Sequence, residues 1–104
     1  MCGIFGEINF NRVKTSKESF LKILKLSKKR GPNNVGYYDK IENLKFGFNR
    51  LSILDLSKHA NQPILSHNKN FLMVFNGEIY NYKEIRKKLN QTGVETIGNA
   101  DTEV

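Results

Sequence analysis

The stretch that decides the fold is MCGIFGEINF, residues 1–10. Apolar and polar positions mix along it, a pattern typical of a β-strand, and the stretch contains two glycines, Gly3 and Gly6. It predicts a strand from Cys2 to Phe10. The single cysteine of the chain then stands at the start of this strand.

A first helix is predicted after this strand, from about Ser16 to Lys29. Thr15, with Glu18 three residues later, resembles a capping box at its start. Gly31-Pro32 is expected to end the helix. The apolar side chains recur at helical spacing and should form one face. They are Phe20, Leu21, Ile23, Leu24 and Leu26.

More strands and a second helix are predicted downstream. Residues 35–39 and 44–51 look like two strands joined by a short polar turn. Residues 71–75 form a compact apolar run, the best candidate for a buried strand, which Asn76-Gly77 closes. A second helix is expected from about Tyr82 to Asn90.

The last residues of the chain carry weaker patterns. Gly93 is expected to terminate the second helix. Ile97 indicates another strand, and Asp101 with Glu103 indicates the start of a third helix. A chain of 104 residues suits one domain at most, and one that stops at such a point looks cut off. We therefore expect residues 1–104 to be the amino-terminal part of a larger domain.

Composition narrows the classes of protein. The chain is 38% hydrophobic and 26% charged, which is ordinary for a soluble globular protein. Its 17 basic residues against 10 acids give a net charge of +7, so a small basic nucleic-acid-binding protein is one alternative. The charges gather on two helix-like stretches, 14–30 and 83–88, and solvated helix faces explain them more simply.

The compartment can also be predicted. One cysteine allows no internal disulfide and fits a reducing environment. Residues 1–10 do not resemble a signal peptide, and no stretch approaches the roughly 20 apolar residues of a membrane helix. A soluble, cytoplasmic protein without a membrane partner is expected.

Cys2 is the candidate nucleophile because of its position. Removal of Met1 would leave Cys2 with both a thiol and a free α-amine. An α-amine with an ordinary pKa of about 7.7–8.0 is partly neutral near neutral pH and can take the thiol proton. The thiolate would attack a carbonyl and form a thioester, which water then cleaves. The alternative is a small buried apolar cysteine, but the neighbouring glycines favour a nucleophile that substrate can approach.

Other polar residues could complete a site. Asn76 and Gly77 could stabilise an oxyanion, or could simply form a tight turn. Arg50 could hold a carboxylate in a bidentate pair, or form a surface salt bridge. Glu78 and Asp101 could receive an ammonium group, or suit a helix dipole. No metal site is predicted, because the two histidines, His59 and His67, lie in polar loops without a ligand partner at sensible spacing.

Six motifs in order resemble the class II glutamine amidotransferase domain, an amino-terminal-nucleophile hydrolase. The match covers essentially the whole chain. It comprises Met1–Gly6, Arg30–Pro32, Arg50–Ile53, Gln62-Pro63, Asn76–Asn81 and Asp101–Val104.

This resemblance implies a fold and an activity. The fold would be α+β, a four-layer α/β/β/α sandwich with antiparallel sheets, of which this chain supplies about half. The reaction would convert glutamine to glutamate and ammonia, with Cys2 as nucleophile and Asn76 and Gly77 as oxyanion hole. The residues that would bind glutamine are Arg50, Leu51, Ser52, Ile53, Leu54, Asn76, Gly77, Glu78 and Asp101.

Within the class, RLSI at 50–53 and NGEIYN at 76–81 are similar to the asparagine synthetase branch. The branch implies a carboxy-terminal synthetase domain, absent here, that uses ATP and Mg²⁺ to make asparagine from aspartate. It also admits a homodimer, whereas it implies neither a cofactor in this domain nor a nucleic-acid partner. The alternatives are an amidotransferase of sugar-polymer or antibiotic pathways, or an inactive fragment.

Four positions depart from the family pattern. Lys29 and Phe48 stand where histidine is usual, Asn33 where aspartate is usual, and Ala100 where serine is common. The first three are not first-line catalytic positions, whereas Ala100 would slightly alter the pocket near Asp101. They leave the glutaminase prediction in place and weaken any prediction of the acceptor.

Overall fold

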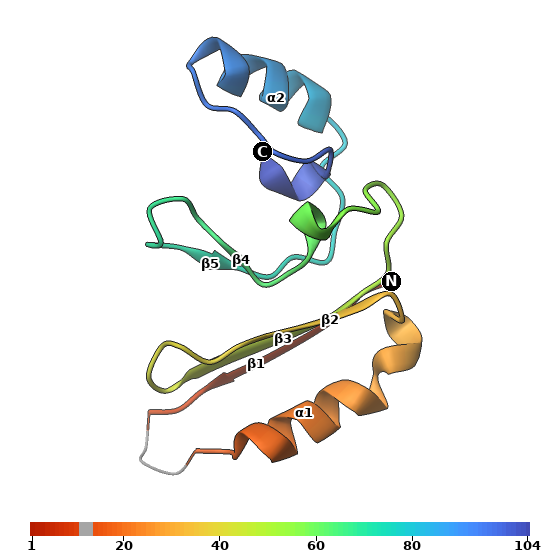
Figure 1. Ribbon diagram of the computed structural model, residues 1–104, viewed down its shortest axis with the longest axis vertical. Helices are drawn as coiled ribbons and strands as arrows, with labels where there is room; N and C mark the ends of the chain where they lie inside the picture. Colours follow the sequence, from red (N-terminus) through yellow and green to blue (C-terminus); the bar gives the residue numbers. More distant parts are fainter. Residues whose placement is uncertain (11–13) are drawn as a thin grey trace. The chain divides into compact units, whose positions relative to one another are not determined.

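The computed structural model describes residues 1–10 and 14–104, which form an α+β structure with antiparallel sheets (Figure 1). The described residues divide into two compact units. The first comprises Met1–Leu51 and Asn61–Asn76, and the second comprises Ser52–Ala60 and Gly77–Val104. The predicted α+β class is confirmed at this level.

A sheet of antiparallel strands organises the first unit. Strand β3 (Leu44–Arg50) lies between β1 (Gly3–Ile8) and β2 (Asn34–Tyr38). The register pairs Gly3 with Asn49 on one side of β3, and Asn34 with Arg50 on the other. The strands predicted over 2–10, 35–39 and 44–51 are therefore confirmed, with ends shifted by one or two residues.

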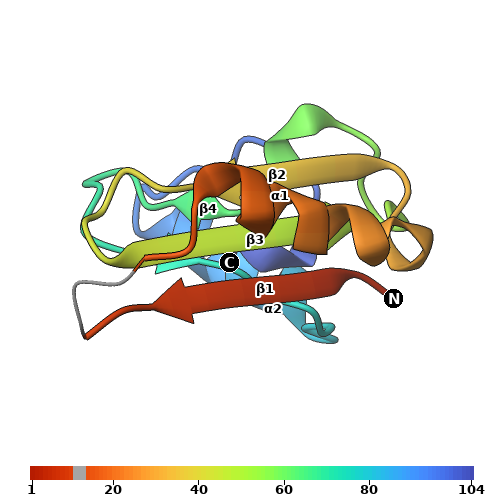
Figure 2. The ribbon, with the colours of Figure 1, turned by 90° about the horizontal axis from the view of Figure 1, so that it is seen from below.

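Helix α1 (Lys17–Leu26) lies along one face of this sheet (Figure 2). It contacts β3 and buries Phe20 and Leu24. A Cβ atom at Gly47 would stand 2.5 Å from Leu24 Cδ2, so glycine at this position lets the helix approach the central strand. Leu26 is 85% exposed, so the predicted apolar face was too wide.

The start and end of α1 correct two predictions. The N-cap is Ser16, whose hydroxyl accepts a hydrogen bond from the Ser19 N–H at 3.1 Å, so the predicted Thr15–Glu18 capping box is wrong. The Thr15 N–H instead donates to the Glu7 carboxylate at 3.0 Å, and the N-cap lies one residue later than predicted. The helix ends at Leu26, and a short 3-10 helix follows over Lys28–Arg30.

A short antiparallel ribbon completes the first unit. It pairs β4 (Ile64–Leu65) with β5 (Leu72–Met73). The buried strand predicted over 71–75 is therefore wrong in length and in burial, since Phe71 is 72% exposed. Hydrophobicity alone could not reveal that this run forms a ladder of only two residue pairs in the described structure.

The second unit contains helix α2 (Tyr82–Gln91) and short 3-10 helices over Lys58–Ala60 and Asp101–Glu103. The predicted second helix is confirmed. So is Gly93 as its terminator, because Gly93 has a φ of 81° and its N–H donates to the Asn90 carbonyl at 3.1 Å. The predicted third helix is, as far as the chain extends, one 3-10 turn.

The strand predicted at Ile97 is wrong. Ile97 is exposed and lies outside the strands of the described residues. The backbone N–H groups that follow it donate to carboxylates instead of to a neighbouring strand: Gly98 to Glu103 at 2.9 Å, and Asn99 to Asp55 at 2.8 Å.

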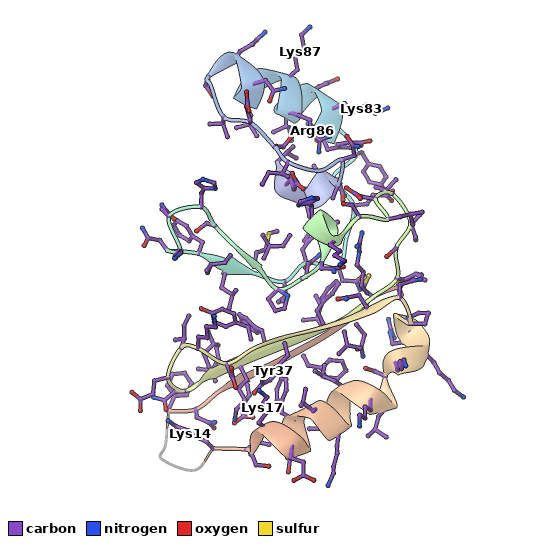
Figure 3. All side chains as sticks on the ribbon, viewed as in Figure 1. Lys14, Lys17, Tyr37, Lys83, Arg86 and Lys87 are labelled. Carbon is purple, nitrogen blue, oxygen red and sulfur yellow. The ribbon has the colours of Figure 1, made fainter. Side chains whose placement is uncertain are left out.

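The basic residues lie mostly on helices, as predicted. In α2, Lys83 and Lys87 point away from the rest of their unit, whereas Arg86 points toward the segment that contains the last 3-10 helix (Figure 3). In the part of the chain that the structure describes, no helix is both long and apolar enough to cross a membrane.

Tyr37 on β2 is packed between the sheet and α1 (Figure 3). Its ring lies 5.6 Å from the Phe20 ring, and the Lys17 ammonium lies 5.2 Å from its centroid. The hydroxyl is buried. Burial, with a smaller contribution from the nearby Asp39 carboxylate, raises the pKa of Tyr37 to about 12.

This pKa predicts a loss of stability at alkaline pH. The folded state holds the Tyr37 proton more tightly than the unfolded state, so the stabilisation is complete below pH 10.0 and is lost as the pH rises through about 12. Tyr37→Phe should flatten the fall of the unfolding free energy across this interval, measured by urea unfolding. Tyr80→Phe, at an exposed position, is the control. An unchanged alkaline fall in Tyr37→Phe would contradict the prediction.

Candidate active site

Cys2 is held by the backbone at the end of β3. Its Sγ accepts a hydrogen bond from the Leu51 N–H at 3.3 Å and lies 3.7 Å from the Leu51 carbonyl oxygen. The side chain is only half-buried. Met1 is exposed. Cys2 is therefore not a fully buried apolar residue, and its thiol is oriented by polar contacts.

Arg50 lies beside this thiol at the last position of β3. The register that pairs Gly3 with Asn49 places Cys2, one residue further, opposite Arg50. Both side chains point to the face of the sheet away from α1. This follows because Asn49 bonds to the Leu24 carbonyl of α1 at 2.7 Å and successive side chains alternate along a strand.

Arg50 is buried and polar contacts fix its head group. The residue is 6% exposed, so it does not lie on the surface, as the salt-bridge alternative supposed. Its Nη1 donates to the Asn61 side-chain oxygen at 2.9 Å. The Arg50 carbonyl accepts from the Asn33 N–H at 3.0 Å. Burial keeps a guanidinium in a water-poor environment, where it interacts strongly with an anion.

Asn76 is the last residue of the first unit, and its side chain is exposed. Its neighbour Phe75 is bonded through both backbone groups to the Gln62 side chain, at 2.5 and 3.1 Å. Gly77, the other predicted oxyanion donor, opens a segment of the second unit and is exposed. The structure thus places Cys2, Arg50, Leu51 and Asn76 in one unit.

The remaining predicted residues belong to the second unit. Ser52 is half-buried, and Ile53, Leu54 and Glu78 are exposed. Asp101 is buried, and its Oδ2 accepts from the Ile79 N–H at 2.8 Å. This bond brings Asp101 next to the segment that carries Glu78, so the two acids that were predicted to receive an ammonium group lie near each other.

Carboxylates whose contacts the sequence analysis did not predict shape the loop before Asp101. Asp55 is buried and accepts from the Ser57 and Asn99 N–H groups at 2.7 and 2.8 Å. Both oxygens of Glu103 accept from the Gly98 N–H at 2.9 Å. The position of Asp55 two residues before a serine is a weak turn signal that could have indicated the first of these bonds.

An arginine on α2 holds the same loop. Arg86 Nη2 donates to the Ala100 carbonyl at 2.7 Å, directly before Asp101. The Arg86 guanidinium also lies 5.5 Å from the Tyr82 ring centroid. Asp101 is therefore fixed by its own side chain and by the carbonyl of its neighbour.

The departures from the family pattern have structural settings. Phe48 is a fully buried core residue of β3, and Ala100 is buried. Lys29 is exposed in the 3-10 helix that follows α1. A Cβ atom at Gly31 would stand 2.1 Å from the Asn49 carbonyl oxygen, so this glycine lets the chain after the 3-10 helix pass directly over β3.

His59 and His67 are both exposed, as predicted. Among residues 1–10 and 14–104, no group of three or more histidine, cysteine or acidic side chains could hold a metal ion. The candidate site residues themselves carry a thiol, an amide, a guanidinium and carboxylates.

The comparisons with known proteins place this arrangement in context. The pattern of the glutamine amidotransferase domain family matches residues 1–104, the whole chain. Glutamine-hydrolysing asparagine synthetase 1 of Bacillus subtilis is 36% identical over 107 residues, which is 100% of this chain and 17% of that protein. Glutamine-hydrolysing asparagine synthetase 2 of Bacillus subtilis is 36% identical over 105 residues, or 97% of this chain and 14% of that protein.

A viral protein is similar over the same span. A probable glutamine-hydrolysing asparagine synthetase of Acanthamoeba polyphaga mimivirus is 36% identical over 108 residues, which is 100% of this chain and 19% of that protein. The chain thus spans between 14% and 19% of the length of these three relatives.

The loop before Asp101 gives a testable prediction. Hydrogen bonds to a charged group are typically worth about 1.5–3 kcal/mol, so Asp55→Ala should speed amide hydrogen exchange at Ser57 and Asn99 by about tenfold or more. Asp55→Asn keeps an acceptor oxygen and should have a smaller effect. Asp39→Ala, at an exposed position in the first unit, is the control. Unchanged exchange at both amides in Asp55→Ala would show that this carboxylate does not hold the loop.

Proposed function

Because the chain belongs to the glutamine amidotransferase domain family, we propose that it hydrolyses L-glutamine to glutamate and ammonia, with Cys2 as nucleophile. One observation carries the proposal. The Cys2 thiol is oriented by the Leu51 N–H at 3.3 Å and stands opposite the buried Arg50 in the sheet register. A thiol and a buried guanidinium thus share one face of one sheet, which supports the proposal.

The first step activates the thiol. Removal of the exposed Met1 would convert the Cys2 backbone nitrogen to an amine. The amine takes the thiol proton, and the thiolate attacks the side-chain amide carbon of glutamine. The C–N bond of the tetrahedral intermediate then breaks, and ammonia leaves with the proton returned by the amine. A thioester remains, and water hydrolyses it to glutamate and the thiol.

Asn76 and Gly77 would stabilise the oxyanion of both tetrahedral intermediates. The side-chain N–H of Asn76 and the backbone N–H of Gly77 are suitable donors. Each such donor is typically worth about 3–4 kcal/mol in the transition state. The exposure of both residues leaves these groups accessible to a substrate.

The ends of the substrate would be held by charge. Arg50 would bind the α-carboxylate of glutamine in a bidentate pair, because a guanidinium matches the geometry of a carboxylate. Glu78 and Asp101 would receive the α-ammonium group, with Asp101 offering Oδ1 because Oδ2 accepts from Ile79. The segment that lines the pocket would be residues 51–54.

The larger protein is also part of the proposal. We propose that these residues are the amino-terminal part of a four-layer α/β/β/α amidotransferase domain. A carboxy-terminal synthetase domain that binds ATP and Mg²⁺ would use the ammonia to make asparagine from aspartate, since the relatives are named asparagine synthetases. We further propose that the intact protein is a cytoplasmic homodimer and that it has no nucleic-acid partner. An amidotransferase with another acceptor remains the alternative.

Covalent labelling tests the nucleophile. A glutamine analogue with an electrophilic side chain should add one equivalent to the intact polypeptide that carries these residues, at Cys2. Cys2→Ala should abolish the adduct, and excess glutamine should protect the wild type. The measurement is peptide mass spectrometry. Stoichiometric labelling at another residue, or none in a folded protein, would contradict the assignment.

Kinetics test Arg50. Arg50→Lys keeps the charge and loses the bidentate geometry, so the KM for glutamine should rise by about tenfold or more with a smaller change in kcat. The measurement is the rate of glutamate release. Glutamine α-amide, which has no carboxylate, should be about equally poor for wild type and variant. A variant that discriminates between the two substrates as well as the wild type does would refute the role of Arg50.

A further inference from the structure

The chain around Asn76 is held in an unusual way. The β4–β5 ladder of the described structure ends at the pair Ile64–Met73. Past this pair, the backbone of Phe75 is bonded to a side chain: its N–H donates to Gln62 Oε1 at 2.5 Å, and its carbonyl accepts from Gln62 Nε2 at 3.1 Å. A glutamine amide offers one acceptor and two donor hydrogens, so it can replace a neighbouring strand at this residue.

Gln62 is itself well fixed. Its side chain is 6% exposed, so its hydrogen bonds to Phe75 do not compete with bulk water. Its backbone lies directly on the sheet, since a Cβ atom at Gly36 of β2 would stand 1.6 Å from the Gln62 carbonyl oxygen. The β1–β3–β2 sheet, Gln62 and Phe75 therefore form a continuous chain of close contacts that ends one residue before Asn76.

The neighbouring residue performs a parallel task. Asn61 accepts a hydrogen bond from Arg50 Nη1 at 2.9 Å. Two consecutive polar side chains thus reach in two directions, one to the proposed carboxylate-binding group and the other to the residue before the proposed oxyanion donor. The matched Gln62-Pro63 motif has no role in the chemical steps proposed above, and these contacts give it one.

We propose that Gln62 is a positioning residue that fixes Asn76 as an oxyanion donor by holding both backbone groups of Phe75. This inference rests on the proposed glutaminase activity. Gln62 does not touch the substrate. It acts by limiting the movement of Phe75, which keeps the Asn76 amide within hydrogen-bond distance of the oxyanion in the tetrahedral intermediate. Catalysis depends steeply on such positioning because the donor is useful only at hydrogen-bond distance from the oxyanion.

Gln62→Leu in the intact polypeptide tests the proposal. It removes both hydrogen bonds at nearly constant volume. The kcat for glutamate release should fall by about ten- to a hundredfold, because a displacement of about 1 Å in a catalytic group can have that effect. The KM for glutamine should change by less than about threefold, since uniform binding is not affected. Asn61→Ala should do the reverse, with a raised KM and a smaller change in kcat.

A double-mutant cycle separates positioning from general damage. If Gln62 acts through Asn76, Gln62→Leu should lower kcat no further, within about twofold, in a protein that already carries Asn76→Ala. A full additional fall would show that Gln62 acts elsewhere and would overturn the proposal. Wild-type kcat in Gln62→Leu would also overturn it.

Two comparisons keep the test decisive. Gln62→Glu keeps the acceptor for the Phe75 N–H and loses the donor, so it should fall between wild type and Gln62→Leu, and it replaces Gln62→Leu in the cycle if that variant does not fold. Gln91→Leu makes the same change at an exposed glutamine of α2 and should leave kcat unchanged. Failure of the glutaminase proposal would be distinguishable, because the wild type itself would then release no glutamate.

Discussion

The antiparallel pairing of β1 with β3 is the constraint on which the rest of the structure depends. Its register places Gly3 against Asn49, and therefore Cys2 against Arg50. Side chains alternate between the faces of a sheet, so a slip of one residue would move Cys2 to the face covered by α1. The site exists because this register is fixed at both ends of the strand: Ile8 pairs with Leu44 at the far end.

Alternate residues of strand β3 face the core and the candidate site. Gly47 admits the Leu24 side chain, and Asn49 bonds to the Leu24 carbonyl, so these positions attach α1. Arg50 points the other way and is held by Asn61. The packing of α1 against one face therefore holds the strand that carries Arg50 on the other face. A thiol and a guanidinium keep a fixed relation only on a strand held in this way.

The sequence predicted the parts of the structure that local patterns determine. Helical spacing located α1 and α2, and glycine with a positive φ marked the end of α2 at Gly93. The order of motifs identified the family, which the match over residues 1–104 confirms. The exposure of Phe71 and the short length of β5 were not predictable, because an apolar run carries no information about how long its partner strand is.

The contacts that the sequence did not predict share one physical feature. Gln62 reaches Phe75, and Asp55 reaches Asn99, through side-chain-to-backbone hydrogen bonds between residues 13 and 44 positions apart. Such bonds have no periodicity and need only one polar atom at the right place in space. The prediction of the α1 cap was wrong for a related reason. The Thr15 N–H donates to Glu7, which is distant in sequence, and the N-cap is Ser16.

The most direct test of the central claim is to trap the covalent intermediate during turnover. The intact polypeptide would be acid-quenched while it hydrolyses isotopically labelled glutamine, and its amino-terminal peptide analysed by mass spectrometry. We predict a peptide that begins at Cys2, without Met1, and carries a labelled glutamyl thioester on that residue. Glutamate release by a protein that retains Met1, or a labelled acyl group on another residue, would contradict the role of Cys2.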